Sequence, residues 1–472
     1  MARETPLSFI ALQRFGLGAR PGDLAAVAAD PRGAVLAEIA PGAALIDDPT
    51  LPDTVAALGT IRAIQKARQA AKAGATPAPA MMAPDSMMDP SEPSAAAAPP
   101  PDPMKPGNPI AAEIAARLAQ AAAAQIGFAE RWAMFWANHF AVQAATNEVV
   151  RWTAGPFDRE AIRPHVFGRF VDLLFAATRH PAMLLSLNNA GSIGPDSKAG
   201  LKRHLGLNEN HARELMELHT IGVTSGYTQA DVTSFADVLT GWTFGNNPDQ
   251  PKTFGQFTFN ANAHEPGPQT ILGTVYAQPG VRQGEAVLAM LAAHPATATH
   301  VATELVRYFV ADTPPPDLVA ALAATFTTTG GDLAAVARAL VGADAAWSAP
   351  MQKLRLPQEY LLAASRALAV APRPPALIKD LDTLGQPLFD PPSPEGYHDD
   401  AATWLAPDAM TSRLDIAQTY AQLADADADP RRVADAVLGD AQSDATRDAI
   451  ARAESPVQGL TLLLMSPEFQ RR

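Results

Sequence analysis

Apolar residues recur at steps of three and four along most of the chain, which is the period of an amphipathic α-helix. The longest pattern covers residues 110–142 and places His139 on its apolar stripe. Other helical patterns cover residues 54–72 and much of residues 286–469. Alternating phenylalanines at residues 254–259 and a second short run at residues 270–276 predict an antiparallel β-hairpin. The pattern predicts a mainly α, large multi-helix globular fold with one small β-hairpin near residues 253–276.

One low-complexity segment interrupts the helical pattern. Residues 76–109 hold 11 prolines and few charges, so regular structure and a packed core are both unfavourable there. We predict a disordered Pro/Ala/Met-rich insertion at residues 74–108. It separates an N-terminal helical segment, residues 1–73, from a main helical domain, residues 109–472, and the first is expected to pack on the second.

The stretch from Asn208 to Trp242 concentrates side chains that can carry chemistry. Two helical patterns flank a short turn at residues 220–227, where Gly222 can end the first helix. Thr228, with an aspartate three residues later, is typical of a helix start. The stretch is therefore predicted to be a helical hairpin, which would place Glu217 and His219 near Tyr227 and Gln229. Its first helix carries a polar arc of Asn210, His211, Arg213, Glu214 and Glu217.

Two interpretations of this helix remain open. In the first it carries a site, in which Glu214 or Glu217 is a general acid or base and Arg213 binds an anionic group or tunes the carboxylate. Asn210, His211, His219 and His139 would complete that site by orienting or ligating. In the second interpretation the arc is an exposed or structural polar network, and His219 is a core histidine. A divalent metal held by histidine and carboxylate side chains is a further form of the first interpretation, although the histidine and glutamate spacing matches neither zinc motif, HExxH or HxxEH. The sequence leaves the metal and the cofactor unassigned.

Composition narrows the classes of partner and compartment. A net charge of −13 argues against nucleic acid, and the absence of cysteine excludes disulfides and thiol nucleophiles. Without an apolar run of membrane-spanning length, no transmembrane helix is expected. The N-terminus shows no signal peptide, so we expect a cytoplasmic protein, or a periplasmic or exported one if a leader is missing from the sequence.

Several phrases spread along the chain resemble a bacterial family, domain of unknown function number 1800. They include RFGLGARPGDL, FWANHF, NENHARELMELHTIGV, LTGW and GQPLFDPPSPEGY. Ala137 in FWANHF stands where the family has a histidine. The resemblance implies a largely helical protein whose gene often lies beside one for a sulfatase-like protein, which is the expected partner.

Two functions of different classes follow. The first is an enzyme of the hydrolase or lyase type that uses the cluster at residues 208–242, acting on an anionic or envelope polymer. The second is a non-catalytic, envelope-associated binding or assembly partner of the sulfatase-like protein, with the polar cluster as a structural network.

Overall fold

The computed structural model describes residues 5–74, 109–203, 206–371 and 373–472. Within them the protein is mainly helical, with two small antiparallel strand pairs, which confirms the predicted fold class. The insertion predicted at residues 74–108 lies almost entirely outside the described residues. The elements of the first half are α1 (Leu7–Ile10), α2 (Asp23–Ala26), α3 (Pro31–Ala37), α4 (Thr54–Gly74), α5 (Pro109–Ala123), α6 (Phe128–His139), α7 (Glu148–Phe157), α8 (Phe170–Arg179), α9 (Pro181–Ser186), α10 (Lys198–Arg203), α11 (Asn210–Glu217) and α12 (Gln229–Leu239).

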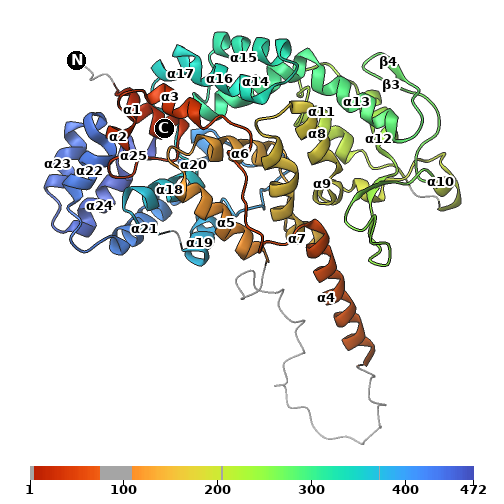
Figure 1. Cartoon of the computed structure of the whole chain (residues 1–472), viewed down its shortest axis with the longest axis horizontal. Helices are drawn as coiled ribbons and strands as arrows, with labels where there is room; N and C mark the ends of the chain where they lie inside the picture. The colour runs from red at the N-terminus through yellow and green to blue at the C-terminus, as the bar shows by residue number, and fades with distance from the viewer. Residues whose placement is uncertain (1–4, 75–108, 204–205, 372) are drawn as a thin grey trace, which may run out of the picture.

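The second half starts with the strands and continues as helices. Its elements are β1 (Trp242–Phe244), β2 (Phe257–Phe259), β3 (Gln269–Ile271), β4 (Thr274–Tyr276), α13 (Val281–Ala293), α14 (Pro295–Phe309), α15 (Pro316–Thr328), α16 (Leu333–Gly342), α17 (Asp344–Ser348), α18 (Pro357–Ala367), α19 (Pro374–Thr383), α20 (Ala401–Trp404), α21 (Pro407–Leu423), α22 (Pro430–Leu438), α23 (Asp444–Ala451), α24 (Pro456–Met465) and α25 (Pro467–Gln470). Figure 1 shows the first helices, α1–α3, beside the last, α22–α25.

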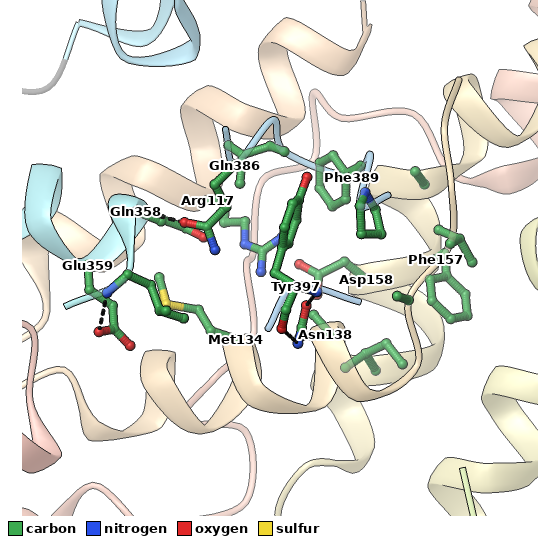
Figure 2. A pocket seen from close by; sticks show the side chains of 18 of the residues that line it. Arg117, Met134, Asn138, Phe157, Asp158, Gln358, Glu359, Gln386, Phe389 and Tyr397 are labelled. Atoms are coloured by element: carbon green, nitrogen blue, oxygen red, sulfur yellow. Dashed lines mark hydrogen bonds between the residues drawn. The ribbon is translucent and has the colours of Figure 1, made fainter. Parts of the chain in front are cut away.

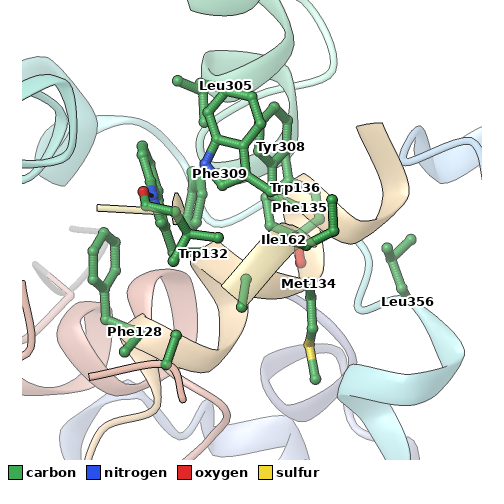
Figure 3. Packing of buried hydrophobic residues seen from close by; sticks show 14 of the residues in the cluster. Phe128, Trp132, Met134, Phe135, Trp136, Ile162, Leu305, Tyr308, Phe309 and Leu356 are labelled. Carbon is green, nitrogen blue, oxygen red and sulfur yellow. Dashed lines mark hydrogen bonds between the residues drawn. The ribbon is translucent and has the colours of Figure 1, made fainter. Parts of the chain in front are cut away.

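Helix α6 forms the centre of the core. Every residue from Phe128 to Trp136 is buried, so the helix is covered on all sides. Trp132 stacks on Phe167 and packs against Phe309 of α14 with ring centroids 5.9 Å apart. Figure 3 shows this aromatic cluster joining α6 to α14. The C-terminal end of α6, with Asn138 and His139, is therefore held in a fixed position against α14.

A buried ion network fixes α18 to the same core. Glu359 of α18 contacts Arg131 of α6 at 3.2 Å and Arg472 at 2.6 Å, and it accepts a hydrogen bond of 2.9 Å from the Tyr308 hydroxyl. All four side chains are buried. Because a buried charge without a partner is strongly unfavourable, the network constrains how α6, α14 and α18 pack.

Two sequence predictions are corrected by the structure. The pattern at residues 110–142 predicts one helix, but the chain breaks into α5 and α6 at Gly127, which adopts a left-handed conformation with φ of 96°. The Glu38 carboxylate accepts hydrogen bonds from the Gly127 and Ala129 amides and caps the new helix start. A period of hydrophobic residues cannot reveal such a break, because both helices bury the same kind of stripe.

The second correction concerns strand pairing. Residues 254–259 were expected to pair with residues 270–276, but β2 pairs with β1 and β3 pairs with β4. Strand β1 begins at Trp242, directly after α12, so its proximity to β2 arises from the helical hairpin. No helix in the parts of the chain that the structure describes is long and apolar enough to cross a membrane.

Candidate functional site

Helices α11 and α12 form the predicted hairpin. Thr228 and Asp231 make the predicted capping box, since the Asp231 amide donates to the Thr228 hydroxyl and the Thr228 amide donates to the Asp231 carboxylate. The Tyr227 hydroxyl donates to Glu217 across the turn. The sequence therefore predicts both the hairpin and the proximity of Glu217 to Tyr227.

The polar arc of α11 is largely self-paired. Arg213 lies 3.2 Å from the Glu209 carboxylate and 3.4 Å from that of Glu217, and it donates a 2.8 Å hydrogen bond to Gln229 of α12. The backbone N–H of Asn210 donates a hydrogen bond to the Asn208 side-chain oxygen at the start of the helix. The side chains of the arc other than His211 are half-buried, and their contacts with one another leave few free polar atoms to bind a substrate.

The two histidines of this region face the core. His211 and His219 are fully buried, and neither ring nitrogen of either residue has a hydrogen-bond partner among the described residues. Burial lowers the pKa of His211 to about 3 and lowers that of His219 further below its ordinary value. Both rings are therefore neutral. His219 is a core histidine, as one interpretation predicts, but without the satisfied nitrogen that interpretation expects.

A polar cavity of about 290 Å³ lies where the ends of α6 and α11 meet α14 and the loop before α20. We call it the outer cavity. Helix α14 presents one face to it, with His300, Glu304 and Arg307 spaced at four and three residues. The remaining wall consists of Phe135, Asn138, His139, Leu218, Asp312, Glu395, Tyr397, His398, Asp399 and Asp400. Acidic side chains outnumber basic ones on this wall.

Asp399, on the wall of the outer cavity, has a raised pKa. Burial raises its pKa to about 6, and nearby Glu304 adds to the rise, while the Lys353 ammonium opposes it. Lys353 is buried and donates to the Asp399 carbonyl oxygen at 2.7 Å, but its principal carboxylate partner is Asp312, at 2.5 Å. The Asp399 carboxyl group therefore lies at the cavity wall and is protonated at pH values below about 6.

Two histidines on the wall have defined tautomers. His139 Nε2 lies 3.2 Å from the His219 carbonyl oxygen, and His300 Nε2 lies 2.8 Å from that of Leu218. A carbonyl oxygen only accepts, so in each neutral ring Nε2 carries the proton and Nδ1 is the acceptor. Burial and the neighbouring His300 lower the pKa of His139, although its ring is half-buried at the cavity wall rather than enclosed.

A second, smaller cavity of about 70 Å³ adjoins the outer one, and we call it the inner cavity. Asn138 and Tyr397 line both cavities, and they are joined by two hydrogen bonds of 2.9 and 2.8 Å between the Asn138 amide group and the Tyr397 backbone. Figure 2 shows Asn138 and Tyr397 beside Arg117 and Asp158. Most of the remaining wall is apolar, including Met134, Ala137, Phe157, Leu388 and Phe389.

Three of the polar side chains that line the inner cavity have unsatisfied atoms. Arg117 Nε, Asp158 Oδ1 and Gln358 Nε2 have no hydrogen-bond partner within the described ranges, and each of these side chains is more than nine-tenths buried. Arg117 lies over the Phe389 ring at 5.3 Å, and the other Asp158 oxygen accepts from Arg163 at 2.7 Å. Buried polar atoms are normally paired, so this wall is suited to a small polar ligand or ordered water.

The structure places the seven predicted site residues in different environments. His139 lines the outer cavity, and Glu214 lies close enough to Glu395 on the cavity wall for that charge to help raise its pKa, after burial and Glu217. Arg213, Glu217 and Asn210 belong to the surface network, while His211 and His219 lie in the core. Sequence reasoning missed the loop acids and the polar face of α14.

A signal for the missed loop is present in the sequence. The run EGYHDD, residues 395–400, has five chemistry-bearing side chains in six positions and overlaps the end of the proline-rich phrase GQPLFDPPSPEGY. Among the residues that the structure describes, no three or more histidine or acidic side chains are placed to hold a metal ion.

A family model described as a protein of unknown function, DUF1800, matches residues 10–471. The chain belongs to the DUF1800 family. The match spans both cavities, from α1 to the last residues, so the whole assembly around α6 is a DUF1800 domain. No curated protein and no solved structure matches the chain.

Proposed function

We propose that this DUF1800 protein is a hydrolase that cleaves glycosidic bonds at the outer cavity, with Asp399 as the general acid and Glu304 as the partner carboxylate. The observation that carries the proposal is the raised pKa of Asp399, about 6, next to a second carboxylate on the same wall. Glycoside hydrolysis uses two carboxyl groups whose environments separate their protonation states.

The environments of the two carboxyl groups differ in the required way. Glu304 forms an ion pair with Arg307, which also lines the outer cavity. Partial burial of Asp399 raises its pKa, and the nearby charge of Glu304 adds to the rise. One group can therefore donate a proton while the other accepts one.

The reaction balances with water as the second substrate. Asp399 donates its proton to the glycosidic oxygen as the carbon–oxygen bond breaks. Glu304 takes a proton from the attacking water, whose oxygen bonds to the sugar carbon. A proton returned from Glu304 to Asp399 through solvent restores the site. His139 lines the outer cavity, and its Nδ1, as an acceptor, would bind a sugar hydroxyl group.

The charge of the wall defines the substrate class. Glu304, Asp312, Glu395, Asp399 and Asp400 outweigh Arg307, so the cavity would repel an anionic polymer and favour a neutral one. Phe135 and Tyr397 supply aromatic surface of the kind that packs on sugar rings. The proposal keeps the hydrolase class predicted from the sequence, but it moves the acid and base off α11 and replaces the anionic substrate by a neutral glycan.

The test is release of reducing ends from neutral oligosaccharides by the purified full chain. We expect product from the wild type and a loss of about 10²- to 10⁴-fold in kcat for Asp399→Asn, with a comparable loss for Glu304→Gln. Because Asp399 acts in its protonated form, kcat should fall as pH rises above about 6. Binding of oligosaccharides without any product would contradict the hydrolase and support the non-catalytic binding function.

A further inference from the structure

We propose that the inner cavity is a specificity pocket for an acetamido group, so that the protein acts on glycans built from N-acetylated amino sugars. This inference rests on the proposed glycan hydrolase, whose site adjoins the pocket through Asn138 and Tyr397. The outer cavity alone indicates a neutral glycan, and the inner cavity specifies which kind of sugar that glycan contains.

The size of the inner cavity sets the size of its ligand. An apolar cavity of about 150 Å³ accommodates the six non-hydrogen atoms of benzene, so about 70 Å³ holds roughly three such atoms. An acetamido group has three such atoms beyond its nitrogen: the carbonyl carbon, the oxygen and the methyl carbon. A sugar ring is too large for the inner cavity, and it fits only in the outer cavity of about 290 Å³.

The polar atoms of the wall match an amide in kind. Arg117 Nε and Gln358 Nε2 are donors without partners, and a carbonyl oxygen accepts from two donors. Asp158 Oδ1 is an acceptor without a partner, and the N–H of an acetamido group is a donor. A carboxylate ligand would leave Asp158 facing a like charge, and an alkyl group would leave all three polar atoms unpaired.

The apolar part of the wall matches the methyl group. Met134, Ala137, Phe157 and Leu388 supply hydrocarbon surface, and the Phe389 ring lies under the Arg117 guanidinium. A methyl group buried there is stabilised by the hydrophobic effect, whereas a hydroxyl group in the same position lacks these contacts. The wall therefore distinguishes an N-acetylated sugar from its hydroxyl counterpart.

The test compares two substrates that differ at the acetamido position, the β-1,4-linked tetramers of N-acetylglucosamine and of glucose. We expect kcat/KM to be at least tenfold higher for the N-acetylated tetramer. Gln358→Leu removes one donor and should lower this preference about tenfold. Gln442→Leu, which changes another buried glutamine outside both cavities, should leave it unchanged. Ala137→Leu, which fills the inner cavity from α6, should abolish the preference if Gln358→Leu does not fold.

Binding to the Asp399→Asn variant separates the two proposals. Calorimetry with the same tetramers measures recognition without turnover, and tighter binding of the N-acetylated tetramer supports the specificity pocket even if no product forms. Equal affinity for the two tetramers, or equal kcat/KM values, would overturn the acetamido pocket and leave the hydrolase standing. Absence of binding to both would overturn the pocket, and absence of product from both would overturn the hydrolase.

Discussion

The polar arc of α11 and the polar wall formed by α14 with the loop before α20 contain similar side chains, but they differ in burial and in how their charges are paired. On α11, Arg213 contacts Glu209 and Glu217, and the Tyr227 hydroxyl donates to Glu217, so the charges are paired at a half-exposed surface. At the outer cavity, Asp399 is largely removed from solvent near the like charge of Glu304, and its pKa is raised. A high density of polar side chains therefore does not distinguish a functional site from a surface network. A functional site is better recognised by polar side chains that are removed from solvent and lack a full set of hydrogen-bond or ion-pair partners.

The buried face of α11 provides the largest expected effect, on acid stability. The pKa of His211, about 3, and that of His219 lie below the ordinary value, so both rings are neutral in the folded state and take up protons on unfolding below pH 6.5. The contribution of these two histidines to the free energy of unfolding is therefore fully present above pH 6.5 and is lost as pH falls below that value. Two protons correspond to about 3 kcal/mol per pH unit, or about 5 kcal/mol between pH 6 and pH 4.

Urea unfolding at a series of pH values measures this slope. Replacing His219 by methionine, which has a similar volume, should reduce the slope by about 1.4 kcal/mol per pH unit, the contribution of one proton. It should change stability at pH 7 by less than about 2 kcal/mol, because no hydrogen bond is lost. A variant with the slope of the wild type would show that His219 is accessible to protons in the folded state. That result would place His219 in a site rather than in the core.

The buried ion network is expected to tolerate change less well than the surface network. Glu359→Ala leaves Arg131 and Arg472 buried without their carboxylate, and the expected cost is about 3 to 5 kcal/mol. Thermal unfolding of the full chain measures this loss. A cost below about 1 kcal/mol would show that water reaches these arginines, and the contrast between interior and surface charges would then fail.

Asp399→Asn is expected to stabilise the protein while removing activity. A folded-state pKa of about 6 against an ordinary value of 3.8 means that ionising Asp399 above pH 6 costs up to about 3 kcal/mol. Asparagine removes this cost, so the gain should appear at pH 7.5 and shrink toward pH 4, where the aspartic acid is protonated. Urea unfolding at the two pH values checks the sign, and destabilisation at pH 7.5 would mean that the Lys353 contact dominates.

The smallest effect is expected on the polar arc of α11. Arg213→Ala breaks two ion pairs between partly exposed side chains, which are typically worth less than about 1 kcal/mol together. The melting temperature of the Arg213→Ala variant should stay near that of the wild type. The difference should shrink at high salt, because salt screens ion pairs between exposed side chains. A larger loss would indicate that the arc has a structural role in joining α11 to α12.

The sequence predicts the local features of this fold and few of its long-range ones. The capping box at Thr228, the contact of Glu217 with Tyr227 and the position of His139 on an apolar stripe follow from spacing alone, because each depends on neighbours within a few residues or on helical period. The break at Gly127 depends on Glu38, and the raised pKa of Asp399 depends on burial beside Glu304. Such environments are created only when distant segments pack together.

The kcat of Asp399→Asn measured beside that of Glu217→Gln, on the N-acetylglucosamine tetramer, decides between the outer cavity and the polar arc. If the outer cavity is the site, Asp399→Asn loses at least about 10²-fold and Glu217→Gln stays within about twofold of the wild type. The reverse order, with Glu217→Gln inactive and Asp399→Asn active, would return the site to α11.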